Sequence, residues 1–211
     1  MKENVKFILA SASPRRHELL LGAGISHEVL VTDADEGASR ERPEGIARAE
    51  WYALEASRIK CEAALASLCA ESGRTFVIAA DTVVSSDLDE VLGKPKDNAD
   101  AVRMLTSLSG AEHYVIGGIT LAELEDGDAV FSSRLCVTKV KMRELTPEMI
   151  DAYVATGEPS DKAGAYAIQG LAGVFVEHFD GDYNNVVGLS TATLADMLQR
   201  DFGFDVTSLW N

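Results

Sequence analysis

The sequence has no long apolar segment and few cationic residues, and both absences restrict what the protein can be. None of its hydrophobic runs approaches the roughly 20 residues that a transmembrane helix requires. Its 19 lysine and arginine residues stand against 34 aspartate and glutamate residues, which gives a formal net charge of −15. Because proteins that bind nucleic-acid polymers neutralise many phosphates with a basic surface, this balance argues against such a partner. A single nucleotide needs only a local group of cations, so it remains compatible with the charge.

Cysteine and histidine are also scarce, which argues against a disulfide framework and a zinc site. The three cysteines, Cys61, Cys69 and Cys136, show no Cys-x-x-Cys spacing, and the four histidines are scattered. Cys61 and Cys69 fall in one predicted helix, where a rise of about 1.5 Å per residue places them about 12 Å apart, beyond disulfide reach. Free thiols are typical of a reducing compartment, and the first residues lead into too short an apolar stretch for a signal peptide. We therefore expect a cytoplasmic protein.

Three common catalytic signatures are missing as well. The sequence contains no Gly-x-x-x-x-Gly-Lys-Ser/Thr loop, no Gly-x-Gly-x-x-Gly after a strand, and no Gly-x-Ser-x-Gly elbow. A P-loop nucleotidase is thereby excluded, and the commonest signal of a serine hydrolase is absent. What remains is a set of short polar clusters, each beside an apolar segment.

The order of apolar and polar segments predicts one domain with a mixed sheet. The 211 residues, 46% of them hydrophobic, suffice for one sizeable core. Residues 75–80 form a continuous apolar run, typical of a central strand buried on both faces. Helices are predicted over 14–21, 46–69, 97–109, 147–156 and 191–199, and further strands over 7–9, 27–31, 113–124, 130–143 and 174–176. This alternation indicates an α/β or α+β fold, with a twisted central sheet flanked by helices, over a single domain of residues 1–211.

Two connecting segments carry more specific expectations. Residues 83–86 and 91–94 flank an acidic stretch and are predicted as the strands of a hairpin with an acidic tip. Residues 158–170 contain two glycines and several polar residues without a clean period. Such a segment is typical of an ordered functional loop.

The stretch Leu9–Arg16 predicts a strand end that runs directly into a helix. Ser13 is a good N-cap residue, and Pro14 suits the first helical position because its missing N–H would be unpaired there anyway. The free amides of such a first turn favour anions. The side chains that would complete an anion site are those of Ser11, Ser13, Arg15 and Arg16. Taken alone, however, an ordinary capped helix with two solvated arginines is the commoner explanation of this stretch.

Further polar clusters combine carboxylates with cations or polar groups. They are Asp35/Glu36, Asp81/Thr82, Lys94 and Asp161/Lys162/Gln169. Cations beside carboxylates suit a phosphorylated substrate, together with a hard divalent cation held by oxygen ligands. Asp81 directly follows the central apolar run, so its carboxylate is expected to be partly desolvated and to need a partner. Individually, Lys94 also fits a surface lysine, the acidic pair a solvated turn, and Gln169 a residue that satisfies loop amides.

Assembled, these segments closely resemble the Maf-like (septum-formation-inhibitor) family of nucleoside triphosphate pyrophosphatases. The matching segments follow the family's order over nearly the whole chain. They are Leu-Ala-Ser-Ala-Ser-Pro-Arg-Arg at 9–16, Ala-Asp-Thr-Val-Val at 80–84, Leu-Gly-Lys-Pro at 92–95, Asp-Lys-Ala-Gly-Ala-Tyr-Ala-Ile-Gln-Gly at 161–170, Gly-Asp-Tyr at 181–183 and Asn-Val-Val-Gly-Leu at 185–189. The resemblance implies an α/β fold with a deep cleft between two lobes, often a homodimer. It also implies cleavage of a nucleoside triphosphate to the monophosphate and pyrophosphate with Mg²⁺ or Mn²⁺.

The resemblance assigns roles by position. Asp81 matches the catalytic base, Lys94 and Lys162 match catalytic cations, and Asp35 and Glu36 match an acidic pair that helps Asp81 to hold the metal. The residues that match the substrate-binding positions are Ser11, Ser13, Arg15, Arg16, Thr82 and Gln169. Among them Arg15, Thr82 and Gln169 resemble the branch that acts on dTTP and UTP. These nucleotides and modified pyrimidine triphosphates are therefore the expected substrates.

Four positions depart from the family's usual pattern. Tyr52 or a neighbour stands where a lysine is usual in a Glu-Lys-Ala run, which removes one candidate phosphate-binding cation. Gly117, Ala167 and Ser190 replace a usual threonine, glycine and proline. Two other functions remain open: a nucleotide-binding regulator of cell division that does not need catalysis, and a purine-directed pyrophosphatase acting on ITP or XTP.

Overall fold

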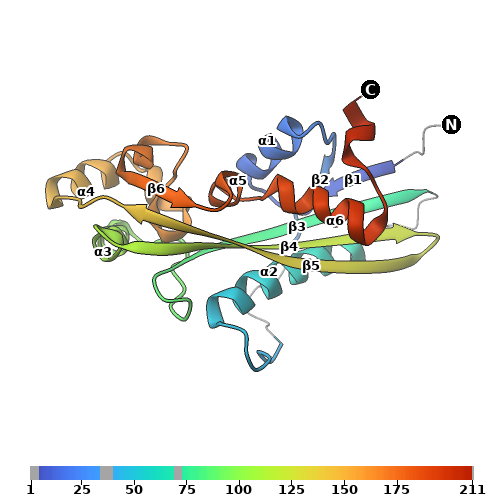
Figure 1. Cartoon of the computed structure of the whole chain (residues 1–211), viewed down its shortest axis with the longest axis horizontal. Coiled ribbons are helices and arrows are strands. Elements are labelled where there is room, and N and C mark those ends of the chain that lie inside the picture. Colours follow the sequence, from blue (N-terminus) through green and yellow to red (C-terminus); the bar gives the residue numbers. More distant parts are fainter. Residues whose placement is uncertain (1–4, 34–39, 69–72, 211) are drawn as a thin grey trace.

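A mixed six-stranded sheet, in the order β2-β1-β3-β4-β5-β6, forms the framework of the computed structural model, which describes residues 5–33, 40–68 and 73–210 (Figure 1). The strands are β1 (Val5–Leu9), β2 (Glu28–Val29), β3 (Arg74–Ser85), β4 (Glu112–Glu125), β5 (Asp128–Met142) and β6 (Val176–Asp180). The strand β1 lies parallel to β2 and β3, whereas the pairs β3–β4, β4–β5 and β5–β6 are antiparallel. The prediction of an α/β protein with a mixed central sheet is confirmed.

Helices cover both faces of this sheet. They are α1 (Pro14–Gly22), α2 (Arg48–Ala66), α3 (Asn98–Leu108), α4 (Pro147–Val154), α5 (Tyr183–Val187) and α6 (Thr191–Phe202), with 3₁₀ turns η1 (Glu158–Asp161), η2 (Ala163–Ala165), η3 (Leu171–Phe175) and η4 (Val206–Trp210). In Figure 1, α1, α5 and α6 lie on one side of the sheet, α2 lies on the other, and α3 and α4 gather at one end. In the described part of the chain, no helix is both long and apolar enough to span a bilayer.

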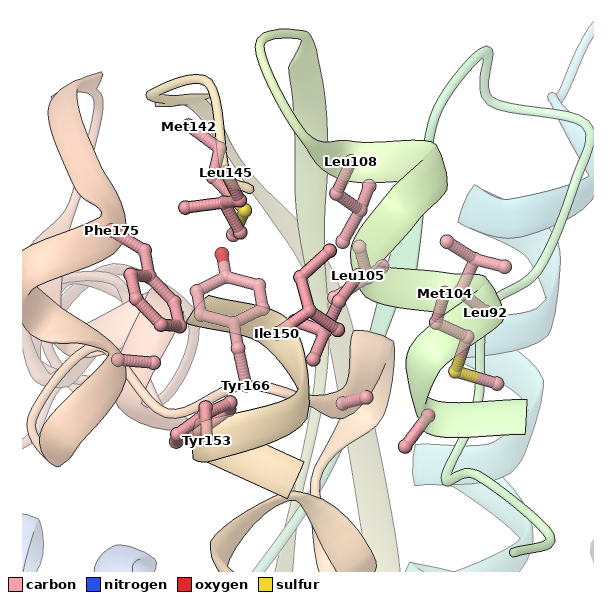
Figure 2. Close-up of a cluster of buried hydrophobic side chains, with 14 of the residues drawn as sticks. Leu92, Met104, Leu105, Leu108, Met142, Leu145, Ile150, Tyr153, Tyr166 and Phe175 are labelled. Atoms are coloured by element: carbon pink, nitrogen blue, oxygen red, sulfur yellow. The ribbon is translucent and has the colours of Figure 1, made fainter. Parts of the chain in front are cut away.

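Two hydrophobic clusters build the two ends of the molecule, and β3 runs through both. Phe76, Ile78 and Ala80 belong to the cluster beneath α1 and α6. Val84 belongs to the cluster formed with α3 and α4, part of which is drawn in Figure 2. Asp81 and Thr82 lie on the strand between these clusters. These two polar residues of a core strand therefore lie where the two hydrophobic clusters meet.

The helix α2 touches the backbone of β4 directly, and a glycine makes this contact possible. Gly118 pairs with Asp81 across the β3–β4 ladder. A Cβ atom at Gly118 would lie 2.1 Å from the backbone oxygen of Ala53 on α2. One turn further along α2, the Ser57 hydroxyl lies 2.8 Å from the Thr120 hydroxyl of β4. The axis of α2 is thus fixed close to the strand pair that carries Asp81.

The expected hairpin over residues 83–94 is formed only at its centre, where Val84 and Leu92 exchange both backbone hydrogen bonds. Residues 83–85 instead continue β3, and Leu92 joins the strand only through an isolated bridge with Val84. Side chains close the acidic segment between them, because Ser85 Oγ accepts the N–H of Leu88 and Asp87 Oδ1 accepts the N–H of Glu90. These local hydrogen bonds limit the backbone pairing to the one bridge between Val84 and Leu92.

Other predicted boundaries also shift. The strand predicted over 174–176 is the 3₁₀ turn η3, and the strand begins only at Val176. The strand predicted over 27–31 is reduced to Glu28–Val29, and the helix predicted over 46–69 spans Arg48–Ala66. The short helix α5 was not predicted, although Asp182 caps it by accepting the N–H groups of Asn184 and Asn185. Cys69 lies outside the described residues.

The close approach at Gly118 predicts a large penalty for a single methyl group. We expect Gly118→Ala to lower the free energy of unfolding by about 1–3 kcal/mol or more, because the new Cβ must push α2 away from β4. Gly22→Ala is the control, since a Cβ added there would meet no atom within 4 Å beyond its neighbours in the helix. Urea denaturation of both variants measures the difference. Equal stabilities would contradict the described packing of α2.

A buried histidine makes stability depend on pH. His113 on β4 is fully buried, and its Nε2 lies 2.8 Å from the hydroxyl of Tyr166. Burial lowers the pKa of His113 from 6.5 to about 4. Between these values the unfolded chain binds a proton that the folded chain does not, so the free energy of unfolding rises with pH across this interval.

The His113→Gln variant tests this linkage. Relative to the variant, the wild-type protein should gain about 1.4 kcal/mol of unfolding free energy per pH unit as pH rises from about 4 to 6.5. Urea denaturation across this range gives the two slopes, and comparing slopes removes any constant loss of stability in the variant. Parallel slopes would contradict a buried neutral His113.

Candidate active site

A cleft of about 520 Å³ opens over the middle of β3, at the junction of the two hydrophobic clusters. This volume falls within the range of about 300–1,000 Å³ that is typical of ligand pockets. All the predicted catalytic and substrate-binding residues line it: Ser11, Ser13, Arg15, Arg16, Asp81, Thr82, Lys94, Lys162 and Gln169. Asp35 and Glu36, predicted to hold a metal, lie outside the described residues. Segments far apart in the sequence thus meet in one cavity.

The cleft exists because β1 ends earlier than β3. The last contact on this side is the N–H of Ala10, which donates to the carbonyl of Ile78. Beyond it the chain turns into α1, while β3 continues through Asp81 and Thr82. In the described residues, this stretch of β3 therefore has a strand neighbour only on the β4 side. The edge of β3 and the start of α1 form two walls of the cavity.

The first turn of α1 keeps its amides available to a ligand. Ser13 occupies the N-cap position, as predicted, but its side chain makes no capping hydrogen bond. Instead, its N–H donates to Ser11 Oγ at 3.2 Å. Pro14 follows at the first helical position. A helix N-terminus without a side-chain cap is well suited to an anion, because its N–H groups and the helix dipole both favour negative charge.

Arg16 ties three segments of the cleft together. Its side chain is 9% exposed, and its Nε donates to the carbonyl of Gly188 at 2.9 Å. The two terminal nitrogens donate to Ser11 Oγ at 3.1 Å and to Thr82 Oγ1 at 3.3 Å. Thr82 Oγ1 in turn donates to the carbonyl of Gly188 at 3.2 Å. One guanidinium thus links the start of α1, the middle of β3 and the segment after α5.

Asp81 has a cationic partner that the sequence reasoning missed. Lys60 on α2 donates from Nζ to Asp81 Oδ1 at 2.7 Å, and the two side chains are only 18% and 13% exposed. The sequence carried a signal for this contact. Ala53 and Ala56 are buried on α2, and Lys60 continues their helical spacing onto the face that meets the sheet. A lysine on the buried stripe of a helix is a candidate partner for a buried carboxylate.

Lys60 supplies the cleft with a cation that the tyrosine at position 52 does not provide. Tyr52 lines the cleft from α2, and its side chain is 42% exposed. Lys60 lies about two turns later on the same helix and reaches the same cavity. The cleft therefore retains a cation from α2 although position 52 is tyrosine.

The turn that carries Lys162 is packed against β3. Gly164 has a φ of +65°, and its N–H donates to the carbonyl of Gly93 at 3.1 Å. A Cβ at Gly164 would lie 2.9 Å from the side chain of Val84. Since Lys94 directly follows Gly93, this contact brings Lys94 and Lys162 to one wall of the cleft.

A second carboxylate lies near the cations of this wall. Asp161 accepts a hydrogen bond from Lys162, and its Oδ2 lies 3.6 Å from the guanidinium of Arg15. The Lys162 hydrogen bond is the main reason why the pKa of Asp161 is lowered, against the effect of burial. Arg15 and Lys162 thus approach each other from the two ends of the molecule.

The described carboxylates do not form a ready-made metal site. Among residues 5–33, 40–68 and 73–210, no group of three histidine, cysteine, aspartate or glutamate side chains could hold a metal ion. Asp81 offers hard oxygen ligands at the floor of the cleft. Mg²⁺ typically binds through one or two carboxylates together with substrate phosphates, so this donor is compatible with a metal that shares the ligand.

Comparisons with known proteins agree with the arrangement of these motifs. The family model described as Maf-like protein matches residues 6–201. A relative from Geotalea uraniireducens (strain Rf4), named dTTP/UTP pyrophosphatase, is 46% identical over 202 residues, covering 95% of this chain and 97% of the relative. A relative of the same name from Acetivibrio thermocellus is 45% identical over 204 residues, covering 96% and 98%.

Solved structures are more distant. A HAM1 protein from Coxiella burnetii is 12% identical and covers 78% of this chain and 88% of its own, with a TM-score of 0.33 that is too low to inform the fold. The family assignment depends instead on the match over residues 6–201 and on the relatives at 45–46% identity. On these two findings, the chain belongs to the Maf-like family.

Proposed function

We propose that this protein is a nucleoside triphosphate pyrophosphatase that hydrolyses dTTP and UTP to the monophosphate and pyrophosphate. The observation that carries the proposal is the convergence of cationic side chains from four segments around Asp81 in one cleft. These cations are Arg15, Arg16, Lys60, Lys94 and Lys162. The relatives named dTTP/UTP pyrophosphatase support an enzyme, and they do not favour a regulator without catalysis.

The cationic walls are suited to a triphosphate. Arg15 and Lys162 meet at Asp161, and Lys94 and the first turn of α1 line the same cavity, so a chain of phosphates would meet several cationic contacts there. Positioned cations stabilise the charge that shifts in the transition state of phosphoryl transfer, and this is the main source of catalysis in such reactions. Arg16 acts mainly on the protein side of the cleft, because its nitrogens already bond Gly188, Ser11 and Thr82.

Asp81 is the proposed catalytic base. In this reaction a water oxygen attacks the α-phosphorus, the bond to the bridging oxygen breaks, and pyrophosphate leaves with that oxygen. Asp81 accepts the proton of the attacking water. Lys60, which donates to Asp81 Oδ1, holds the carboxylate in place and brings a positive charge next to the reacting phosphate. The pair thus combines orientation of the base with stabilisation of charge.

A divalent cation, Mg²⁺ or Mn²⁺, is part of the proposal because the family's pyrophosphatases are generally metal-dependent. Asp81 would contribute carboxylate oxygens to the ion, and the substrate would contribute phosphate oxygens. When bound, the metal would neutralise phosphate charge and polarise the phosphorus centre. Asp35 and Glu36 remain proposed as further ligands.

Selection of a pyrimidine base is assigned to Arg15, Thr82 and Gln169. Thr82 is held by Arg16 and Gly188, whereas Gln169 is exposed at the cleft. Modified pyrimidine triphosphates belong to the same proposed class. The proposal places the protein in the cytoplasm, where nucleotides and free thiols occur together. A homodimer, which the family resemblance implies, belongs to the same proposal.

A substrate panel tests the proposal. The protein is incubated with dTTP, UTP, CTP, ITP and ATP in the presence of Mg²⁺ or Mn²⁺, and the phosphate products are identified. We expect dTTP and UTP to give the highest kcat/KM, with monophosphate and pyrophosphate as products. Binding of a nonhydrolysable analogue without any turnover would favour a regulator, and a preference for ITP would favour a purine-directed enzyme.

The Asp81→Asn variant tests the assigned base. It should lower kcat by about 10²–10⁴-fold because the amide cannot accept the proton. The Asp151→Asn variant removes an equal charge from an exposed position on α4 and should leave kcat unchanged. Circular dichroism verifies that both variants are folded. Near-normal release of pyrophosphate by Asp81→Asn would refute the assignment.

The Lys60→Met variant tests the partner of the base. It should lower kcat/KM by about 10²–10³-fold, the range seen when one charge-stabilising donor is removed. Arg58→Met is the matched control, because Arg58 is an exposed cation on the same helix that pairs with Glu62. If both variants lose the same small amount of activity, Lys60 has no specific role in the cleft.

A further inference from the structure

The loop that carries Lys162 and Gln169 begins and ends at one carboxylate. Glu158 Oε1 accepts a hydrogen bond from the Tyr153 hydroxyl at 2.9 Å. Glu158 Oε2 accepts the backbone N–H of Leu171 at 3.1 Å. The side chain at the start of the loop therefore holds the residue that follows its end. Glu158 belongs to none of the motifs that predicted the catalytic and substrate-binding residues.

Gly170 allows the carboxylate to lie flat against the end of the loop. A Cβ atom at Gly170 would lie 2.4 Å from Glu158 Oε1 and 2.7 Å from Oε2. The φ of Gly170 is −105°, which any residue can adopt, so glycine is needed here for space and not for backbone conformation. The direct neighbour of Gln169 is thus in contact with Glu158.

The other side of the carboxylate is anchored in the core. Tyr153 on α4 is 4% exposed, and its ring meets that of Phe175 edge to face at 5.3 Å between centroids. Both rings belong to the hydrophobic cluster of Figure 2. Glu158 therefore connects this packed cluster to the end of the loop through its two hydrogen bonds.

The middle of the loop is held by two contacts that do not involve Glu158. Gly164 is held by Gly93, and Tyr166 by His113. Lys162 lies close to the first of these anchors. Gln169 lies beyond both, between Tyr166 and the contact of Glu158 with Leu171. Loss of Glu158 should therefore release Gln169 far more than Lys162.

We propose that Glu158 is a positioning residue for base selection, which fixes Gln169 at the cleft by closing the loop of residues 158–171. The inference rests on the proposed function, since it takes Gln169 to contact the base. It predicts that Glu158 governs discrimination among bases more than the chemical step, which depends on Asp81 and Lys60.

Two substitutions disturb the same contact from opposite sides. Glu158→Met keeps about the length of the side chain but removes both oxygens that accept from Tyr153 and Leu171. Gly170→Ala leaves Glu158 in place and displaces its carboxylate. Each variant should reduce the ratio of kcat/KM for UTP to that for CTP on the order of tenfold, the effect of one lost hydrogen bond to a charged group. The kcat for UTP should change much less.

The double variant supplies a coupling test. Because both substitutions break one contact, the double variant should be no worse than either single variant. The Asp151→Asn variant, on the exposed face of α4, is the control and should leave the ratio unchanged. Additive losses, or an unchanged ratio in both single variants, would overturn the proposal.

Hydrogen exchange tests the contact without using activity. The amide of Leu171 should exchange faster in Glu158→Met than in the wild-type protein, whereas that of Gly164 should not change. If the wild-type protein hydrolyses no triphosphate, the proposed function fails while this measurement still reports on the contact. Faster exchange at Leu171 with unchanged base discrimination would show that Glu158 is only structural.

Discussion

The ion pair between Lys60 and Asp81 is the interaction on which the cleft depends. A carboxylate in the middle of a core strand is costly to bury unless a partner reaches it. The partner comes from α2, and α2 can approach only because Gly118 presents no side chain to Ala53. Close packing of a helix on a glycine therefore places a cation 2.7 Å from the carboxylate. The packing of α2 on β4 therefore also positions the partner of Asp81.

The surrounding cavity follows from an interruption in the sheet. The strand β1 stops at Leu9 while β3 continues, and the chain fills part of the gap with the start of α1. Two hydrophobic clusters hold the ends of β3, and the polar residues between them line the cavity. The result is a concave site with cationic walls in a chain of net charge −15. Such a local field can attract a small anion while the overall charge disfavours a nucleic-acid polymer.

Much of this arrangement could be predicted from the sequence, because several signals were local. The apolar run at 75–80 identified the central strand, Pro14 after Ser13 located the start of α1, and the position of Asp81 after that run indicated a partly desolvated carboxylate. The predicted catalytic and substrate-binding residues line one cleft, whereas Asp35 and Glu36 lie outside the described residues. These features depend on neighbours in the chain, which a single sequence displays.

The missing features depend on contacts between distant residues. Lys60 had no motif of its own, and its role appears only when α2 is placed against β3. The stretch 83–94 had the composition of a hairpin, but β3 pairs with β4 as far as Ser85 and leaves Leu92 a single bridge. Glu158 acts through Leu171, thirteen residues later, across a loop without a regular period. Such contacts are decided by packing and not by local propensity.

The central claim is that water activated at Asp81 attacks the α-phosphorus of a pyrimidine nucleoside triphosphate. Hydrolysis of UTP in water labelled with a heavy oxygen isotope tests it most directly, because the label marks the phosphorus that was attacked. Mass spectrometry should find the label in UMP and none in pyrophosphate. Label in pyrophosphate, or release of UDP and orthophosphate, would contradict it.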